Sequence, residues 1–239
     1  MVFVVFYLYR ARMASPDGEN LRVEPVSFYP AFIDLNGRRC LVVGGGPVGT
    51  EKAEKLVEAG ADVRLVSPEI TPRLAKLVAV GAIGEHHRRG YRPSDLDGCL
   101  LVIAATNVPA VNLRVWDDGE ARRMLVNVVD VPHLCNFIVP SIMRRGELAV
   151  AVSTGGASPV VARRVRRIVE REVGAEWGEL VGILRDTREE LKLRFTDMPS
   201  RAAAVEALLE TDVVERLAAG DRDGALDLVA RHLGTAVPA

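Results

Sequence analysis

The sequence contains few of the residues on which disulfide-bonded and metal-binding proteins depend. Its 239 residues include 3 cysteines, which lie far apart and form no Cys-x-x-Cys pair, and 4 histidines. An odd number of widely spaced cysteines indicates neither a disulfide framework nor a zinc site, so a reducing cytoplasm is the expected location. The adjacent His86 and His87 would point to opposite faces of a strand, which favours surface placement over metal binding. We therefore expect no resident metal site.

The sequence also lacks a charge excess and a long apolar run. Its 31 basic and 32 acidic residues give a formal net charge of -1, so no overall field attracts nucleic acid or an anionic membrane. The apolar stretch from Met1 to Tyr9 is too short to span a bilayer, and it has neither the basic start nor the cleavage site of a secretory signal. We interpret residues 1–27 as an N-terminal extension, with Met13 as an alternative start.

What the sequence does contain is the composition of a globular protein and a strand–helix–strand unit. Hydrophobic residues make up 49% of the chain and charged residues 26%. The chain is long enough to bury a core without disulfide bonds or metal ions. An apolar run over residues 39–43 ends directly in glycines, which is typical of a buried parallel strand. A helix is predicted over residues 50–59, with Gly60 as its left-handed cap, and a second strand over residues 63–66.

The same alternation continues along the chain. The pattern predicts a helix over residues 70–80, a strand over 100–105, a helix that begins at Pro109 and ends near Arg123, and a strand over 125–129. Strands that alternate with helices indicate a parallel sheet with right-handed crossovers.

The character of the sequence changes after Pro140. A strand over residues 148–152 and a flexible loop lead into a long, arginine-rich helix that begins at Ser158-Pro159. From Glu176 onward the chain is predicted to be helical, with breaks at Met198-Pro199, Gly220 and Gly234.

A glycine-rich loop of the form Gly-x-Gly-x-x-Gly connects the first predicted strand to the first predicted helix. Gly44 permits the tight turn, Gly46 lets the backbone approach a pyrophosphate, and Gly49 lets helix and strand pack closely. The helix N-terminus adds unpaired N–H groups and the positive end of a dipole. This context favours dinucleotide binding over the alternative, a glycine turn in an ordinary α/β protein. The predicted cofactor-binding residues are Gly44, Gly45, Gly46, Pro47, Val48, Gly49, Ser67, Thr106 and Asn107.

The residues after the second predicted strand bear on the choice of cofactor. An acid that would bind the ribose hydroxyls is expected there, about 20 residues after the glycine loop, and it is missing. The strand ends in Ser67, which can still hydrogen-bond to ribose, and Glu69 follows two residues later. Because no arginine directly follows to bind a 2′-phosphate, NAD is favoured, and NADP stays an open alternative.

The predicted fold class is α/β, a Rossmann-like parallel sheet followed by a small α+β segment and an all-helical tail. In such a sheet, ligands bind beyond the carboxyl ends of the strands. Asn127 and Asp130 lie at one strand end, so the Asp130 carboxylate is expected at the mouth of the cleft, where it would accept a proton or hold a substrate N–H. An aspartate that caps a turn at Val131-Pro132 explains the position equally well. His133 is a weaker catalytic candidate.

The loop before the arginine-rich helix is a candidate anion site. Its hydroxyls, backbone amides and helix dipole suit a carboxylate, whereas the alternative is a plain helix start preceded by hinge glycines. The arginines are expected to form a solvated or salt-bridged face on which acidic ligands could bind. The arginines in question are Arg163, Arg164, Arg166, Arg167 and Arg171.

Several segments, in this order, resemble the dehydrogenase module of siroheme synthases, across roughly residues 28–173. They are Tyr29-Pro30-Ala31-Phe32-Ile33-Asp34-Leu35, Val42-Val43-Gly44-Gly45-Gly46-Pro47-Val48, Ala104-Ala105-Thr106-Asn107, Asn127-Val128-Val129-Asp130, Phe137-Ile138-Val139-Pro140-Ser141 and Ser153-Thr154-Gly155-Gly156-Ala157-Ser158-Pro159. The tail after Gly174 matches more loosely. The chain is similar to a stand-alone precorrin-2 dehydrogenase, without the methyltransferase domain that is fused in some relatives.

The resemblance implies that the chain oxidises precorrin-2 to sirohydrochlorin with NAD, on the way to siroheme. It implies a homodimer in which the segment after about Pro140 intertwines with its partner, and it matches Asp130 to the family's essential aspartate. The expected substrate-binding residues are Asn127, Ser153, Thr154, Gly155, Gly156 and Ser158. The expected domains are the extension (1–27), the Rossmann NAD-binding domain (28–139), a dimerisation segment (140–173) and a helical domain (174–239).

Two other functions stay open at this point. Some family members also insert iron into sirohydrochlorin, and a chelatase could use Asp130 and the macrocycle itself as the coordination scaffold. From a different class, the chain could be a nucleotide-sensing module without catalysis, since many such proteins carry this fold. Asp130 and the hydroxyl-bearing loop favour an enzyme, because a sensor needs no polar residues beyond the cofactor site.

Overall fold

The computed structural model describes residues 28–234, and the predictions for the N-terminal extension and for Met13 lie outside this range. The described chain forms two compact units. The first ends at Val139 and also takes in residues 155–157, while the second consists of residues 140–154 and 158–234. Each unit is described here by itself.

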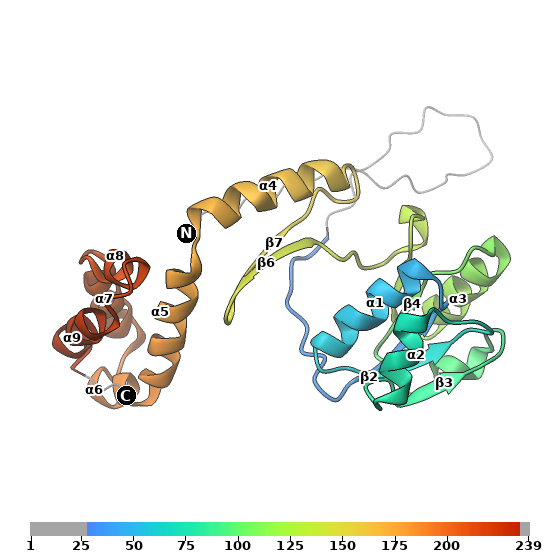
Figure 1. The fold of residues 1–239 in the computed structure, drawn as a ribbon, viewed down its shortest axis with the longest axis horizontal. Helices are drawn as coiled ribbons and strands as arrows, with labels where there is room; N and C mark the ends of the chain where they lie inside the picture. Colours follow the sequence, from blue (N-terminus) through green and yellow to red (C-terminus); the bar gives the residue numbers. More distant parts are fainter. Residues whose placement is uncertain (1–27, 235–239) are drawn as a thin grey trace. The chain divides into compact units, whose positions relative to one another are not determined.

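The first unit is built on a parallel sheet of five strands in the order β3-β2-β1-β4-β5. The strands are β1 (Arg39–Val43), β2 (Asp62–Val66), β3 (Glu85–His87), β4 (Leu101–Ala104) and β5 (Leu125–Val128). Val43 is in register with Val66 on one side and with Ala104 on the other. The carboxyl ends of the central strands therefore lie at one edge of the sheet, as the sequence pattern predicts (Figure 1).

Helices cover both faces of this sheet, which explains why β1, β4 and β5 are apolar almost without alternation. Helices α1 (Pro47–Glu58) and α2 (Pro72–Ala79) supply Ala53, Leu56 and Leu74 to the core on one face. Helix α3 (Pro109–Ala121) and the short 3₁₀ helix η1 (Pro93–Leu96) cover the other face. Gly60 has a φ of 76° and ends α1 as predicted. Helix α1 begins at Pro47 rather than at Thr50, since proline fits the first turn.

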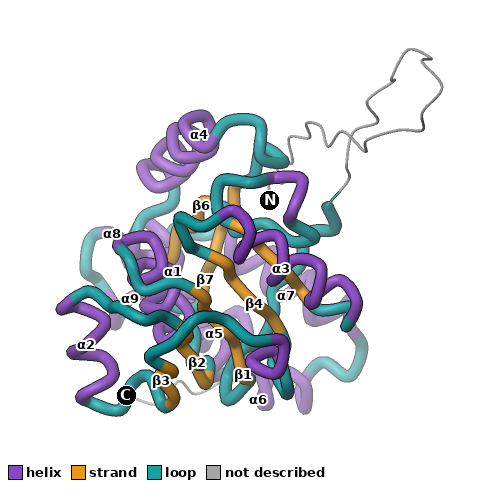
Figure 2. The backbone as a smooth tube through the Cα atoms, turned by 90° about the vertical axis from the view of Figure 1, so that its right-hand side faces the viewer, coloured by secondary structure: helices purple, strands orange, loops and turns teal. Residues whose placement is uncertain are grey.

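The second unit begins with a hairpin of β6 (Ser141–Arg145) and β7 (Leu148–Val152), which pair antiparallel (Figure 2). The sequence pattern predicts β7 only. Strand β6 buries one side chain, Met143, so its sequence carries little apolar alternation. Gly146, with a φ of 56°, supplies the positive φ that a two-residue hairpin turn requires.

The rest of the second unit is helical. Its helices are α4 (Pro159–Glu172), α5 (Ala175–Asp186), α6 (Arg188–Arg194), α7 (Met198–Leu209), α8 (Val213–Ala218) and α9 (Arg222–Leu233). Helices α5 to α9 share one apolar core that includes Leu180, Leu208 and Leu233. The predicted break at Met198-Pro199 is wrong by a few residues: both residues lie in the first turn of α7, because the Asp197 side chain caps the helix and proline is tolerated there.

Candidate functional site

The glycine loop lies at the carboxyl edge of the sheet and is shaped by close backbone contacts. Gly44 has a φ of 115°, and a Cβ there would collide with the Ala105 carbonyl oxygen. A Cβ on Gly49 would collide with the carbonyl oxygen of Gly44, and one on Gly45 would collide with that of Glu69. Three of the four loop glycines are therefore required by packing within the protein itself.

Gly46 differs from these glycines in having open space around it. It lies at the exposed tip of the loop with Pro47 and Val48, and a Cβ there would meet nothing within 4 Å. Gly46 also has an extended conformation that any residue can adopt, with a φ of -73°. Neither backbone conformation nor internal packing requires glycine at this position. The space that a bound ligand would need is therefore the remaining physical reason for a glycine here.

The N-terminus of α1 is open beyond this loop. Gly46 is the N-cap residue, no side chain caps the helix, and the first backbone bond within it runs from the Thr50 N–H to the Gly46 carbonyl at 2.9 Å. The N–H groups of Val48 and Gly49 therefore lie at a free helix terminus, an arrangement that binds phosphate. An open glycine tip and uncapped amides fit a dinucleotide pyrophosphate.

Thr50 and Thr71 support the loop, and sequence analysis did not identify either residue. The Thr50 hydroxyl donates to the Gly46 carbonyl at 2.9 Å, and its oxygen lies 2.8 Å from the Thr71 hydroxyl. The Thr71 N–H donates to the Gly45 carbonyl at 3.0 Å. Because Thr50 is 4% exposed, these bonds form a buried connection between the glycine loop and the start of α2.

Ser67 lies beside the glycine loop, but its hydroxyl hydrogen is already used. The side chain is 7% exposed and donates to the Glu69 carbonyl at 2.6 Å. Its oxygen can still accept a hydrogen bond, so a ribose hydroxyl would have to be the donor. The structure also brings Arg88 to this edge, since the Ser67 N–H donates to the carbonyl of His87 at 3.1 Å. Glu69 and Arg88 are both exposed.

The loop after β4 contains a second internal network. The Thr106 hydroxyl donates to the Asn112 side chain at 2.7 Å and accepts from the Val108 N–H at 3.1 Å. The Asn112 amide in turn donates to the Thr106 carbonyl at 2.9 Å. Thr106 therefore shapes the start of α3 with its side chain, whereas Asn107 is exposed at the tip. Their predicted contact with the cofactor stays a prediction.

Asp130 is the most unusual residue at this edge of the sheet. It is exposed, and its φ of 60° places it in the left-handed region, at a cost of about 1 kcal/mol for a residue with a Cβ. It follows β5 in a turn that the Val131 N–H closes on the Val128 carbonyl at 3.1 Å. Within residues 28–234 its carboxylate forms no hydrogen bond or ion pair. The turn-capping alternative therefore receives no support from this side chain, which leaves the carboxylate available to a ligand.

Asn127 lies in a different environment from Asp130. Its side chain is 9% exposed, and its amide donates to the Phe137 carbonyl at 3.0 Å. It thus holds the segment after Asp130 against β5, and its predicted contact with substrate stays a prediction. His133 is exposed in η2 (Pro132–Leu134), between Asp130 and this segment.

In the second unit, the Thr154 and Ser158 hydroxyls of the predicted anion loop form hydrogen bonds with the backbone of the loop and of the first turn of α4. The Thr154 hydroxyl accepts from the Ser158 N–H at 3.0 Å and donates to the Ser158 carbonyl at 3.1 Å. The Ser158 side chain accepts from the Val161 N–H at 3.3 Å and is the N-cap of α4. Gly155 and Gly156 have φ values of 62° and 92°. The geometry of Thr154 and Ser158 is that of a capped helix start, and the predicted contacts of this loop with substrate stay predictions.

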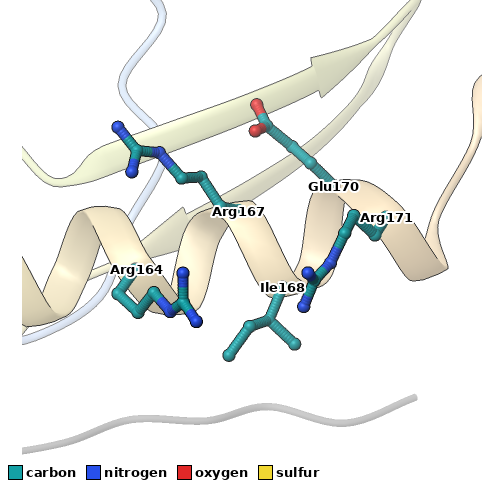
Figure 3. A pocket seen from close by; sticks show the side chains of 5 residues that line it. All are labelled: Arg164, Arg167, Ile168, Glu170 and Arg171. Carbon is teal, nitrogen blue, oxygen red and sulfur yellow. The ribbon is translucent and has the colours of Figure 1, made fainter.

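The arginines of α4 differ in their partners. Arg166 pairs with Glu170 one turn along the helix. Arg164, Arg167 and Arg171 form no ion pair within the described chain, and with Ile168 and Glu170 they line a hollow of about 310 Å³ (Figure 3). This face is basic with a small apolar centre, which suits an anionic ligand that also has apolar surface.

The described residues offer no candidate for two other kinds of site. Across residues 28–234, no helix combines the length and the apolar character that crossing a bilayer requires. The same residues hold no group of three or more His, Cys, Asp or Glu side chains arranged to bind a metal ion.

Known families match both units. Residues 31–141 match the family described as putative NAD(P)-binding, and residues 145–172 match the family described as sirohaem biosynthesis protein central. A solved structure of SirC, precorrin-2 dehydrogenase, aligns with a TM-score of 0.69 and 24% identity, covering 86% of this chain and 98% of that one. At this identity the alignment shows that the fold is shared.

Curated relatives carry the name siroheme synthase. That of Pseudomonas entomophila is 44% identical over 195 residues, which are 82% of this chain and 42% of the relative. That of Azotobacter vinelandii is 41% identical over 213 residues, which are 89% of this chain and 46% of the relative. The chain thus spans less than half the length of these relatives. Over the part that it matches, the chain is similar to siroheme synthases, as the sequence motifs predict.

Proposed function

We propose that this chain is an NAD-dependent precorrin-2 dehydrogenase that forms sirohydrochlorin, and that it works as a homodimer in the cytoplasm. The observation that carries the proposal is Asp130, which lies at the same sheet edge as the open glycine loop and has a strained backbone conformation. Its carboxylate forms no hydrogen bond or ion pair within residues 28–234. Strained residues persist where function requires them. The family relationship supplies the substrate: the relatives are siroheme synthases, and the shared fold is that of a precorrin-2 dehydrogenase.

The glycine loop and its neighbours would hold the cofactor. The amides of Val48 and Gly49 would bind the pyrophosphate over Gly46, and the Ser67 oxygen would accept a hydrogen bond from a ribose hydroxyl. Bound NAD supplies an acceptor for the hydride that leaves the reduced macrocycle. Glu69 would repel a 2′-phosphate, and this favours NAD, whereas Arg88 would attract one. Glu69→Gln and Arg88→Gln are therefore expected to shift the ratio of the NADP and NAD dissociation constants in opposite directions.

Asp130 would act on the macrocycle. Loss of a hydride from carbon and of a proton from a neighbouring pyrrolic nitrogen extends the conjugation of the ring, which drives the reaction. The Asp130 carboxylate would orient the macrocycle through its N–H groups or accept the departing proton. Because the side chain is exposed, the proton can pass on to solvent.

Carboxylates on the substrate would need cationic and N–H partners. We assign this role to Arg164, Arg167 and Arg171 of α4, whose guanidinium groups bind carboxylates well. Arg164→Gln and Arg167→Gln are expected to raise the KM for precorrin-2 with little change in kcat. Arg163→Gln, which makes the same charge change on the same helix outside the hollow, is the matched control.

Asp130→Ala tests the proposal directly. Turnover should fall by at least about a thousandfold while NAD affinity and the free energy of unfolding stay near their normal values. Asp117→Ala removes another exposed carboxylate, on α3, and should leave turnover unchanged. Full activity of Asp130→Ala would reject the assignment. NAD binding without any turnover by the unaltered protein would instead favour a nucleotide sensor.

A further inference from the structure

The turn that carries Asp130 is tied to a buried thiol. Cys135 is 3% exposed, and its Sγ atom lies 3.2 Å from the Val128 carbonyl oxygen and 3.4 Å from the Val131 carbonyl oxygen. Val128 and Val131 are the first and last residues of the turn, with Asp130 between them. A single S–H group is thus shared between the two ends of the turn, on the side away from solvent.

The residues next to Cys135 fix it in place. The Asn136 side chain accepts from the Val126 N–H at 2.7 Å and donates to the Met124 carbonyl at 2.7 Å, and its backbone N–H donates to the Val126 carbonyl at 3.0 Å. Asn127 holds Cys135 and Phe137 from β5 through its side-chain amide. Residues 135–137 therefore form a short antiparallel segment along the open edge of β5, with Asn127 opposite Cys135.

This arrangement joins a strained residue to a rigid support. A left-handed aspartate persists only where its surroundings hold it, because relaxation to a negative φ would relieve the strain. The Val131 N–H is one restraint on the turn, and the thiol bond to the same Val128 carbonyl is a second. The thiol bond is weak individually, but it lies in a buried position where a lost donor is not replaced by water.

We propose that Cys135 is a positioning residue for Asp130, which it holds in the orientation required for turnover through the carbonyls of Val128 and Val131. The inference rests on the proposed function of Asp130 and deepens it. Cys135 itself touches neither substrate nor cofactor in this account. Its role is to keep the turn from relaxing, so its loss should lower kcat and leave cofactor binding intact.

The test compares two buried cysteines of the same unit. Cys135→Ala removes the support, whereas Cys40→Ala removes a thiol that is 0% exposed within β1 and, in the part of the chain that the structure describes, bonds to the Arg38 carbonyl at 3.6 Å. Cys135→Ala is expected to lower kcat at least about tenfold, because small displacements of a catalytic group are costly. NAD affinity should stay unchanged in both variants, and Cys40→Ala should retain its kcat. Cys135→Ser keeps a donor and should restore most of the lost kcat; if Cys135→Ala does not fold, Cys135→Val replaces it as the variant without a donor.

One further measurement separates this inference from the proposed function. Amide hydrogen exchange at Val131 should quicken in Cys135→Ala and not in Cys40→Ala. Equal kcat in the two single variants, or an unchanged Val131 exchange rate in Cys135→Ala, would overturn the positioning role and leave the dehydrogenase proposal standing. Full activity of Asp130→Asn would reject the proposed role of Asp130, while the exchange rate at Val131 would still decide whether Cys135 holds the turn.

Discussion

The hydroxyl oxygens of Thr50 and Thr71 lie 2.8 Å apart and link the first turn of α1 to the N-cap of α2. Because Thr50 donates to the Gly46 carbonyl, Thr71 must donate to Thr50, and Thr71 in turn accepts from the Leu74 N–H at 3.2 Å. Three successive hydrogen bonds thus connect the glycine loop to a second helix. The loop that would hold the cofactor is therefore stiff before any ligand binds.

Replacement of Thr50 by Val should loosen this connection. The shape is kept, but one buried donor is lost, so the free energy of unfolding should fall by about 1–2 kcal/mol in urea titrations. The NAD dissociation constant should rise several-fold, since the loop is no longer held. Thr50→Ser, which keeps the hydroxyl, is the control. A Thr50→Val protein with the stability and NAD affinity of the unaltered chain would show that the hydroxyl pair does not support the loop.

Gly46 and Gly44 should respond differently to alanine. Gly46→Ala meets no protein atom within 4 Å, so the fold should keep its stability while NAD binding weakens at least about tenfold, because the Cβ would occupy the space of the pyrophosphate. Gly44→Ala should instead destabilise the fold by about 2 kcal/mol or more, since it combines a positive φ with a collision at Ala105.

Gly81→Ala isolates the cost of conformation alone. Gly81 has a φ of 75° and no atom near its Cβ position, so this variant should lose only about 1 kcal/mol and keep its NAD affinity. Chemical denaturation and calorimetric NAD titration of the three variants provide the comparison. Normal NAD affinity of Gly46→Ala would show that the tip of the glycine loop does not bind the cofactor.

Asp130→Gly should separate stability from activity at a single position. Glycine adopts a positive φ without strain, so the free energy of unfolding should stay equal or rise by up to about 1 kcal/mol. Turnover should nevertheless be lost with the carboxylate. Thermal unfolding and a dehydrogenase assay on the same sample would show this trade-off, and a marked loss of stability would mean that the Asp130 side chain supports the fold.

The sequence predicts what is local and does not predict what depends on distant contacts. The glycine loop, the cap at Gly60 and the strand end at Asp130 follow from short patterns, and the fold class was correct for that reason. The bonds of Thr50 to Thr71 and of Cys135 to Val128 join residues that no periodic pattern relates. Sequence reasoning therefore named residues at the strand ends and missed Thr50, Thr71 and Cys135, which support them.

Spacing does not predict which hydrogen bonds a side chain forms within the fold. The Ser158 hydroxyl caps α4, and the Asn127 amide donates to the Phe137 carbonyl. Their contacts with substrate stay predictions. Strand β6 was not predicted, because only one of its side chains is buried and its sequence therefore shows little apolar alternation.

Stability should fall at alkaline pH through Cys40. Burial raises the pKa of this thiol from its ordinary value of 9.0 to about 12, with smaller contributions from Cys99 and Asp62. Below pH 9 the thiol is protonated in both states and its contribution is fully present. Between about pH 9 and 12 the unfolded chain loses the proton and the folded chain keeps it, so the free energy of unfolding should fall by about 1.4 kcal/mol per pH unit from this group.

Cys40→Ala should flatten that slope. Denaturation curves of the two proteins from pH 8 to 10 give the effect of Cys40 as the difference between their slopes, because Cys99, whose pKa burial also raises, is present in both. Tyr91, whose pKa burial raises too, begins to contribute only above its ordinary value of 10.0. An identical slope in the variant and the unaltered protein would mean that Cys40 is accessible to solvent in the folded state.

The most direct test of the proposed function is an anaerobic incubation of the purified protein with precorrin-2 and either NAD or NADP, in which the absorbance of sirohydrochlorin is followed. We predict that sirohydrochlorin forms with the unaltered protein, faster with NAD than with NADP, and that Asp130→Asn forms none above the rate without enzyme. Failure of the unaltered protein to form sirohydrochlorin with either cofactor would contradict the proposed function, and full activity of Asp130→Asn would contradict the role of its carboxylate.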